Sequence, residues 1–315
     1  MGLLLLVLGI APLLFGANLF VSGASSTARR FNVPPMAIGL TIVAFGTSAP
    51  ELGVNVLAAA QGNPDVVLGN IIGSNLANIF AILGVAALIR ALPVNRKTTW
   101  IEIPLAGLAA LALLTASLDP VLEQQPAVIG RAEGILFLFF FVIFLAYVAS
   151  MMKSDNNLAE IPESRWSVGL SLLATAGGLA MLIGGSQLVV TGATQTARML
   201  GVSERVIAST VVAIGTSLPE LITSVVAARK GETDIAVGNV VGSNIFNTFL
   251  VLGISAIVQP IPVSAAFSGD LLINLAAAAL LFIFVFTGKG RAVTRGEGIV
   301  FLAAYGGYIT LLLVR

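Results

Sequence analysis

Residues Thr41 to Gly84 read TIVAFGTSAPELGVNVLAAAQGNPDVVLGNIIGSNLANIFAILG, and residues Thr210 to Gly253 read TVVAIGTSLPELITSVVAARKGETDIAVGNVVGSNIFNTFLVLG. The two segments align without a gap at an offset of 169 residues, and 23 of the 44 positions are identical. The shared positions include Gly46/Gly215, Thr47/Thr216, Ser48/Ser217, Pro50/Pro219, Glu51/Glu220, Asn70/Asn239, Ser74/Ser243 and Asn78/Asn247. The positions at which the two segments differ are mostly aliphatic. A repeat kept only for packing would show the opposite pattern, so we infer that a polar site was duplicated with its backbone geometry.

The composition is that of a membrane protein. The chain is 57% hydrophobic and 10% charged, against about 25% charged residues in soluble domains. Apolar segments of the roughly 20 residues that a bilayer crossing needs recur along the whole length. The N-terminal segment MGLLLLVLGIAPLLFGANLF lacks a basic region and a clear small-residue cleavage site. We interpret it as the first span and not as a removed signal peptide.

Two residue types are absent, and this narrows the chemistry. The chain has no cysteine and no histidine, which excludes disulfides, thiolate chemistry and imidazole ligands for metal or haem. A metal ion bound by this chain would therefore be held by oxygen ligands. The net charge of +1 implies no general affinity for nucleic acid. We expect no cofactor and no protein partner, only ions and the lipid bilayer.

The apolar segments predict an all-α membrane protein with ten transmembrane helices. The expected spans are 2–28, 35–60, 64–89, 98–117, 127–151, 167–197, 204–228, 233–258, 266–288 and 296–314. With the N-terminus outside the cell membrane, 12 of the 16 Lys and Arg residues lie in cytoplasmic loops. The positive-inside rule therefore predicts that both termini are outside.

The repeat offset predicts that the two halves are inverted. The first copy occupies the second and third spans, and the second copy occupies the seventh and eighth. Five spans separate equivalent helices, so these helices cross in opposite directions, as in secondary transporters with alternating access. Weaker similarity continues upstream at Gly16/Gly185, Gly23/Gly192 and Arg29/Arg198. We expect five-helix repeats at residues 1–152 and 167–315, joined by a cytoplasmic connector at 153–166.

Two glutamates mark the expected site. Glu51 and Glu220 fall near the middle of otherwise apolar helices, where an ionised carboxylate costs about 3 kcal/mol. A bound cation would neutralise them; protonated or structurally bonded carboxyls are the alternative. Thr47 with Glu51 and Ser74 with Asn78 are i and i+4 pairs on one helix face, and the second copy repeats both. Their oxygens suit hard cations such as Ca²⁺ and Na⁺, although a single Thr or Ser could equally bond to its own helix.

Prolines and glycines predict irregular backbone at the site. Pro50 and Pro219 donate no N–H and displace the carbonyls four residues earlier, those of Gly46 and Gly215. Such backbone survives at membrane depth only where it is buried or lines a cavity, so we expect broken helices whose carbonyls can coordinate a cation. Another set of glycines would let paired helices approach closely, although packing alone explains them as well. They are Gly69, Gly73, Gly238 and Gly242.

GTSAPE and GTSLPE, each followed by GN-x-x-GSN-x-x-N, resemble the α-repeats of the cation/calcium exchanger superfamily, most closely those of its sodium/calcium exchanger branch. The resemblance covers nearly the whole chain and implies exchange of Ca²⁺ for Na⁺ without a large cytoplasmic regulatory domain. It implies central Ca²⁺ ligands, Na⁺ ligands that flank or share the site, and amides that close its middle. The central Ca²⁺ ligands would be Glu51, Glu220 and the carbonyls of Thr47 and Thr216. The Na⁺ ligands would be Ser48, Ser217, Ser74, Ser243 and the carbonyls of Ala44 and Ala213. The amides that close the middle of the site would be Asn78 and Asn247.

The resemblance also separates coupling modes. Some relatives, including potassium-dependent ones, carry Asp at the position of Asn247, so asparagine at both Asn78 and Asn247 argues for K⁺-independent exchange. The resemblance further implies electrogenic exchange, because members of the family move more Na⁺ charge than Ca²⁺ charge. H⁺-coupled exchange of Ca²⁺ or another divalent ion is the alternative, although that branch usually carries a different glutamate motif. A cation channel and an intramembrane enzyme are the competing classes. The inverted repeat favours a transporter over a channel, and no nucleophile–base pair supports an enzyme.

Overall fold

The computed structural model describes residues 2–122, 124–154, 166–201, 213–287 and 290–314. Eight of its helices are long and apolar enough to cross a membrane. A ninth crossing is formed if Pro35–Thr47 and Ala49–Ala60, which meet at a bend of 47°, count as one broken span. The expected helical membrane fold is thereby confirmed.

The elements follow the predicted spans closely. The first half contains α1 (Gly2–Arg30), α2 (Pro35–Ile38), η1 (Gly39–Val43), α3 (Ala44–Thr47), α4 (Ala49–Ala60), α5 (Pro64–Leu76), η2 (Ala77–Leu83), α6 (Gly84–Ile89), β1 (Leu92–Pro93), η3 (Thr98–Glu102), α7 (Ile103–Thr115), α8 (Asp119–Leu122), β2 (Val128–Ile129) and α9 (Arg131–Ser154). The second half contains α10 (Val168–Met199), α12 (Ala213–Thr216), α13 (Leu218–Lys230), α14 (Thr233–Ile245), η5 (Phe246–Leu252), α15 (Gly253–Val258), β3 (Ile261–Pro262), η6 (Ala265–Phe267), α16 (Ser268–Phe284), β4 (Ala292–Val293) and α17 (Arg295–Val314).

Parts of two predictions lie outside the described residues. The predicted span 204–228 is described only from α12 onward, and the predicted connector 153–166 is described only at its two ends. The tenth crossing and the domain boundaries therefore stay predictions.

The loops differ from the all-α expectation in one respect. Four two-residue strands form two antiparallel pairs, β1 with β4 and β2 with β3. Leu92 lies opposite Val293, and Ile129 lies opposite Ile261. The pairs satisfy backbone groups of connections between helices, where no helical partner is available. Such short pairs give no periodic signal in the sequence.

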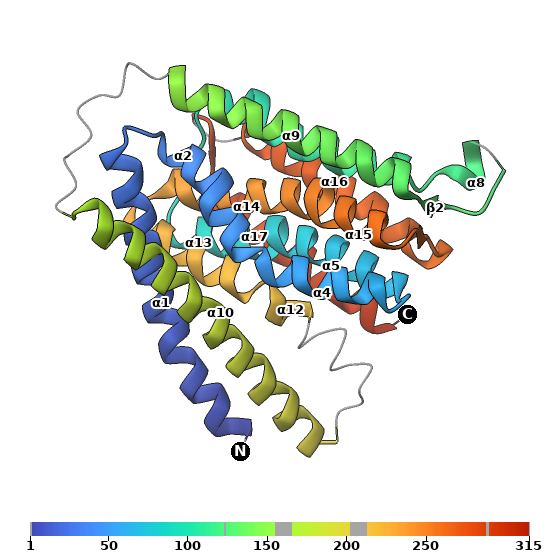
Figure 1. Cartoon of the computed structure of the whole chain (residues 1–315), viewed down its shortest axis with the longest axis horizontal. Coiled ribbons are helices and arrows are strands. Elements are labelled where there is room, and N and C mark those ends of the chain that lie inside the picture. Colours follow the sequence, from blue (N-terminus) through green and yellow to red (C-terminus); the bar gives the residue numbers. More distant parts are fainter. Residues whose placement is uncertain (1, 123, 155–165, 202–212, 288–289, 315) are drawn as a thin grey trace.

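Helices α1 and α10 form a long antiparallel pair that projects away from the remaining helices (Figure 1). Glycines recur every seventh residue on both helices: Gly2, Gly9, Gly16 and Gly23 on α1, and Gly178, Gly185 and Gly192 on α10. A Cβ added at Gly178 would lie 2.4 Å from the backbone nitrogen of Phe20. Only glycine permits this backbone contact, which is how helices associate closely in a membrane.

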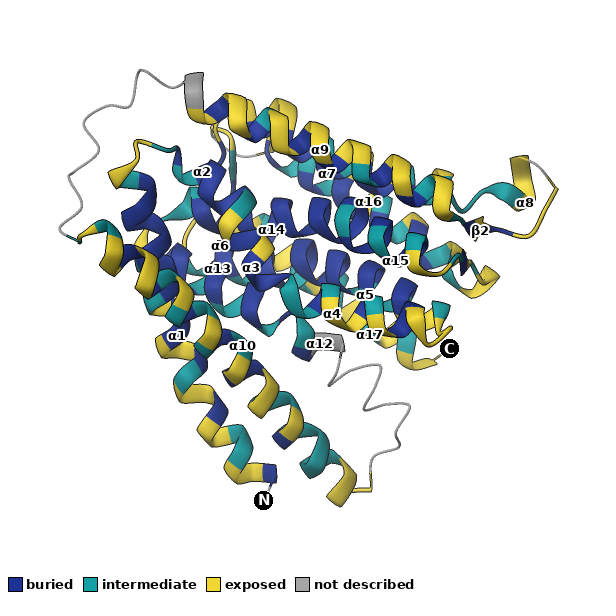
Figure 2. Ribbon diagram, in the orientation of Figure 1, coloured by how far each residue is buried: buried dark blue, intermediate teal, exposed yellow. Residues whose placement is uncertain are grey.

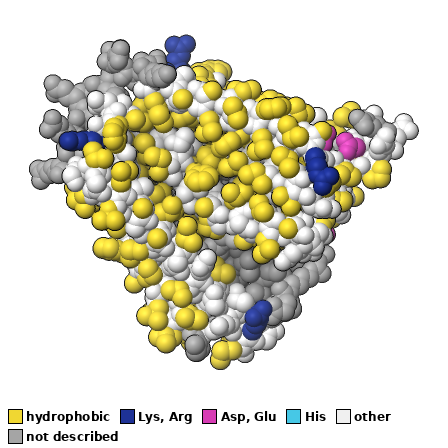
Figure 3. All heavy atoms as spheres, viewed as in Figure 1, with side chains coloured by type: hydrophobic (Ala, Val, Ile, Leu, Met, Phe, Trp, Pro, Cys, Tyr) yellow, Lys and Arg dark blue, Asp and Glu magenta, His cyan; other side chains and the backbone are white. Residues whose placement is uncertain are grey.

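The centre of the molecule is formed by α5, α13 and α14 with the π-helices η2 and η5, and burial is concentrated there (Figure 2). Every residue of α14 from Ile235 to Ile245 is buried. The outer helices α1, α9 and α10 expose apolar side chains, and the surface in Figure 3 is largely hydrophobic with charges at its margins. A lipid-facing surface has this character, whereas the centre is where polar groups are shielded.

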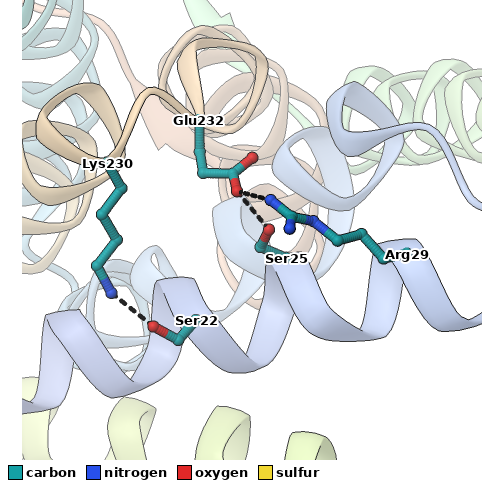
Figure 4. Close-up of polar contacts among 5 residues, drawn as sticks. All are labelled: Ser22, Ser25, Arg29, Lys230 and Glu232. Carbon is teal, nitrogen blue, oxygen red and sulfur yellow. Dashed lines mark hydrogen bonds and ion pairs between the residues drawn. The ribbon is translucent and has the colours of Figure 1, made fainter. Parts of the chain in front are cut away.

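One end of α1 is attached to the connection between α13 and α14 by polar contacts (Figure 4). Arg29 forms an ion pair with Glu232 at 2.6 Å, and Ser25 donates a hydrogen bond to the same carboxylate oxygen at 2.6 Å. Lys230 donates to the hydroxyl of Ser22 at 2.5 Å. The repeat equivalents of Lys230 and Glu232 are Gln61 and Asn63, which carry no charge.

Candidate functional site

A break in the helix exposes the first copy of the motif to the centre of the molecule. Helix α3 ends at Thr47 and α4 begins at Ala49, with Ser48 at φ −84° and ψ 4°. In the second copy α12 ends at Thr216 and α13 begins at Leu218, with Ser217 at φ −88° and ψ 7°. Each break precedes a proline, which fits the first turn of a helix because it needs no N–H donor there. The expected broken helices are present at both copies.

The two glutamates lie together in the interior. Glu51 and Glu220 are each 1% exposed, and the charge of Glu220 acts on the carboxyl group of Glu51. Ser48 donates a hydrogen bond to Glu220 Oε1 at 3.0 Å, while Thr216 lies beside Glu51. Each carboxylate is therefore approached by hydroxyl groups from the other copy.

The two copies form matching hydrogen bonds with each other across the centre of the molecule. Thr47 donates to Asn239 Oδ1 at 3.0 Å, and Thr216 donates to Asn70 Oδ1 at 3.3 Å. Further bonds between the copies join Ser48 with Ser243 at 3.1 Å, Ser217 with Ser74 at 3.3 Å, Asn78 with Asn244 at 2.9 Å and Asn247 with Asn75 at 3.2 Å. The site is thus one structure built by both copies, because neither copy forms these bonds alone.

Five buried side-chain oxygens at this centre accept no hydrogen bond within the described part of the chain. They are both carboxylate oxygens of Glu51, Oε2 of Glu220, Oδ1 of Asn78 and Oδ1 of Asn247. Buried polar atoms are nearly always satisfied, and an isolated buried carboxylate is costly. Carboxylate and amide oxygens are the ligands that hard cations take. The residues present therefore fit a transported cation as the missing partner.

Two of the backbone carbonyls that we expected to be free already accept hydrogen bonds, unlike the five side-chain oxygens. The carbonyl of Ala44 accepts hydrogen bonds from the backbone N–H of Ser48 at 2.9 Å and from the hydroxyl of Thr47 at 3.3 Å. The carbonyl of Gly215, expected to be freed by Pro219, accepts a hydrogen bond from Ser186 at 2.9 Å. Ala213 is the first residue of α12, and its side chain lies outside the described part. These carbonyls would bind a cation with their second lone pair or after a local change.

Several site residues were not assigned from the sequence. Asn70 and Asn239 contact Thr216 and Thr47, and Asn75 and Asn244 bond to Asn247 and Asn78. The identity of these positions between the copies was the available signal. The π-helices η2 and η5 were also missed. They occupy equivalent residues and carry Asn78 and Asn247 at their second positions; wide turns of this kind frequently occur at functional sites.

The family described as sodium/calcium exchanger protein matches residues 1–149 and 170–314. The chain belongs to this family. The exchanger is 42% identical to the putative antiporter CaxA of Alkalimonas amylolytica, with 97% of each chain covered. It is 33% identical to the sodium/calcium exchanger MaX1 of Methanosarcina acetivorans, with 98% of this chain and 97% of the relative covered. These matches confirm the resemblance inferred from the repeats.

The fold agrees with the family. The exchanger superposes on the structure of the sodium-calcium exchanger NCX_Mj with a TM-score of 0.85, at 31% identity and with 98% of each chain covered. Family and fold are those of multi-pass membrane proteins that exchange cations for Ca²⁺.

Proposed function

We propose that this exchanger is a secondary antiporter that moves Ca²⁺ in one direction and Na⁺ in the other by alternating access. The observation that carries the proposal is the set of five unpartnered oxygens around Glu51 and Glu220. Two carboxylates balance one Ca²⁺ or two Na⁺, so the same oxygens can hold either ion in turn. No catalytic role is proposed for any residue.

The contacts between the copies support an inverted repeat of ten helices. The start of α1 meets the end of α10, since Gly2 lies against Gly192 and Gly23 lies against Ser171. These helices contain the equivalent residues Gly16/Gly185 and Gly23/Gly192, so equivalent helices run in opposite directions there. Two copies that cross the membrane in opposite directions can close the same site from either side.

On the proposed orientation, with both termini outside, the two Thr–Asn pairs lie at different depths. Asn70 and Asn239 each lie six residues after the first residue of their helices, which begin at Pro64 outside and at Thr233 inside. The inner pair, Thr47 and Asn239, is fully buried, whereas the outer pair is half-buried. This difference supports a conformation that is closed toward the cytoplasm and more accessible from outside.

The charge of the site supports K⁺-independent transport. Asn78 and Asn247 add oxygens without adding charge, so a K⁺ bound together with Ca²⁺ would be uncompensated. Exchange is proposed to be electrogenic, with more Na⁺ charge than Ca²⁺ charge moved per cycle as the family resemblance implies. A membrane potential then acts on the cycle with about 2.3 kcal/mol per charge per 100 mV.

Proteoliposomes test the proposal. Ca²⁺ uptake should be driven by an outward Na⁺ gradient, should persist when K⁺ is removed from both sides, and should accelerate with an inside-positive potential. Uptake driven by a proton gradient alone would favour the H⁺-coupled alternative. Current without any counter-ion gradient would identify a channel, and strict dependence on K⁺ would contradict the interpretation of Asn247.

A further inference from the structure

Two asparagines outside the proposed ligand set connect the candidate ligands of the two copies. Asn78 Nδ2 donates to Asn244 Oδ1 at 2.9 Å, and Asn247 Nδ2 donates to Asn75 Oδ1 at 3.2 Å. Each candidate ligand thus uses its nitrogen for this bond. Its oxygen is buried and accepts no hydrogen bond from any described residue.

The direction of the first bond is determined by the backbone. An asparagine side chain has a donor end and an acceptor end of nearly equal size, so its neighbours decide which way it points. Asn244 Nδ2 donates to the backbone carbonyl of Asn75 at 3.4 Å. Because a carbonyl can only accept, Asn244 must present its oxygen to Asn78. Asn78 must therefore present its nitrogen to Asn244, which leaves its oxygen for the ion site.

The second bond has a different anchor. Asn75 Nδ2 donates to the hydroxyl of Thr248 at 3.2 Å, in the orientation that turns Asn75 Oδ1 toward Asn247. A hydroxyl can donate as well as accept, so this bond stabilises that orientation without being the only arrangement the hydroxyl allows. Thr248 is fully buried in η5. The equivalent residue of the first copy is Ile79, so this anchor exists on one side only. The orientation of Asn247 is thus stabilised by one hydroxyl, whereas that of Asn78 is fixed by a backbone carbonyl that can only accept.

We propose that Asn75, Asn244 and Thr248 are positioning residues that keep the oxygens of Asn78 and Asn247 turned toward the transported cation. The inference rests on the proposed function. A reversed amide would present two N–H donors to a cation, whereas Ca²⁺ and Na⁺ require oxygen. The backbone carbonyl of Asn75 fixes the Asn78 half of this relay, and Thr248 stabilises the Asn247 half.

Thr248→Val tests the relay because it replaces the hydroxyl with a methyl group of similar size. The KM for Ca²⁺ and for Na⁺ in proteoliposomes should rise about three- to tenfold, the size expected for one lost hydrogen bond, with the maximal rate within about twofold. Thr248→Ser should restore the wild-type KM. Ile79→Val, at the equivalent position of the first copy, is the matched control and should leave both KM values unchanged.

A second pair of variants decides the case even if Thr248→Val does not fold. Asn75→Asp can only accept, so it holds the Asn247 nitrogen and should give a KM for Ca²⁺ no higher than that of the wild type. Asn75→Leu removes the acceptor and should raise it. Equal KM values in both variants, or in Thr248→Val and the wild type, would overturn the inference. Absence of exchange by the wild-type protein would instead overturn the proposed function.

Discussion

The two copies of the motif share their site residues but not their surroundings. Asn239 is fully buried, accepts from Thr47 and donates to Ser224 Oγ at 2.9 Å and to the carbonyl of Glu220 at 3.3 Å. Its equivalent Asn70 is half-buried, accepts from Thr216, and has an Nδ2 without a partner among the described residues. The same side chain is therefore a structural bridge in one copy and a loosely held group in the other.

The carboxylates show a similar difference. Ser48 holds one oxygen of Glu220, whereas both oxygens of Glu51 are unpartnered. The proposed inverted repeat requires such inequality in each of its end states, because perfectly equivalent halves would leave the site equally open or closed to both sides. The comparison separates what the copies contribute jointly, the proposed cation ligands, from what distinguishes them, the strength with which each half is held.

The largest expected effect is on the shared ligands. Glu51→Gln and Glu220→Gln should each reduce the efficiency of Ca²⁺ exchange at least about 30-fold, because removing one partner of a buried charge pair costs about 2–5 kcal/mol. Proteoliposome uptake measures the loss. Asp65→Asn, which removes an exposed carboxylate from α5, is the matched control and should behave as the wild type. Near-normal transport in either glutamate variant would refute the assignment.

The two asparagines should differ in stability. Asn239→Ala removes three hydrogen bonds and leaves their buried partner groups without a hydrogen bond. It should therefore lower the free energy of unfolding by about 1–3 kcal/mol. Asn70→Ala removes one bond at a half-buried position and should cost less than about 1.5 kcal/mol. Thermal unfolding of the detergent-solubilised protein measures both. An equal loss at the two positions would show that the copies are held alike.

A smaller effect is expected at the polar contacts that join α1 to the second copy. Glu232→Gln breaks the ion pair with Arg29 and should lower thermal stability slightly, by at most about 1 kcal/mol, because that pair is partly exposed. The loss should shrink as ionic strength rises. Arg30→Gln, at an exposed neighbour of Arg29, is the control. A loss that does not change with salt would show that the charge of Glu232 is not what holds α1.

The smallest effect on exchange activity is expected from two single-cysteine substitutions that test the inverted arrangement by labelling. Because the chain has no cysteine, Gln61→Cys and Lys230→Cys each introduce one reactive thiol at repeat-equivalent, exposed positions. A membrane-impermeant maleimide should react with the first from outside and with the second only from the cytoplasmic side, with exchange activity largely retained. Reaction of both from one side would contradict the inverted arrangement.

Much of the site could be predicted because its chemistry is local. The duplicated GTSxPE motif identified Glu51, Glu220 and the adjacent Thr and Ser residues, and the prolines indicated where each helix breaks. Helix bounds at Pro64–Ile89 and Thr233–Val258 agree with the expected spans, because apolar length and turn residues act over a few positions. Membrane class and family follow from the same local features.

Only the tertiary structure decided how the copies meet. That Thr47 bonds to Asn239, that Ser48 bonds to Glu220, and that amide oxygens and not nitrogens remain unpartnered at Asn78 and Asn247 depend on residues more than 140 positions apart. The glycines at every seventh residue of α1 and α10 likewise allow close packing only because the two backbones are in contact. Sequence determines which groups are available, whereas packing determines their distances and their burial, and these set the free energy of an ion site.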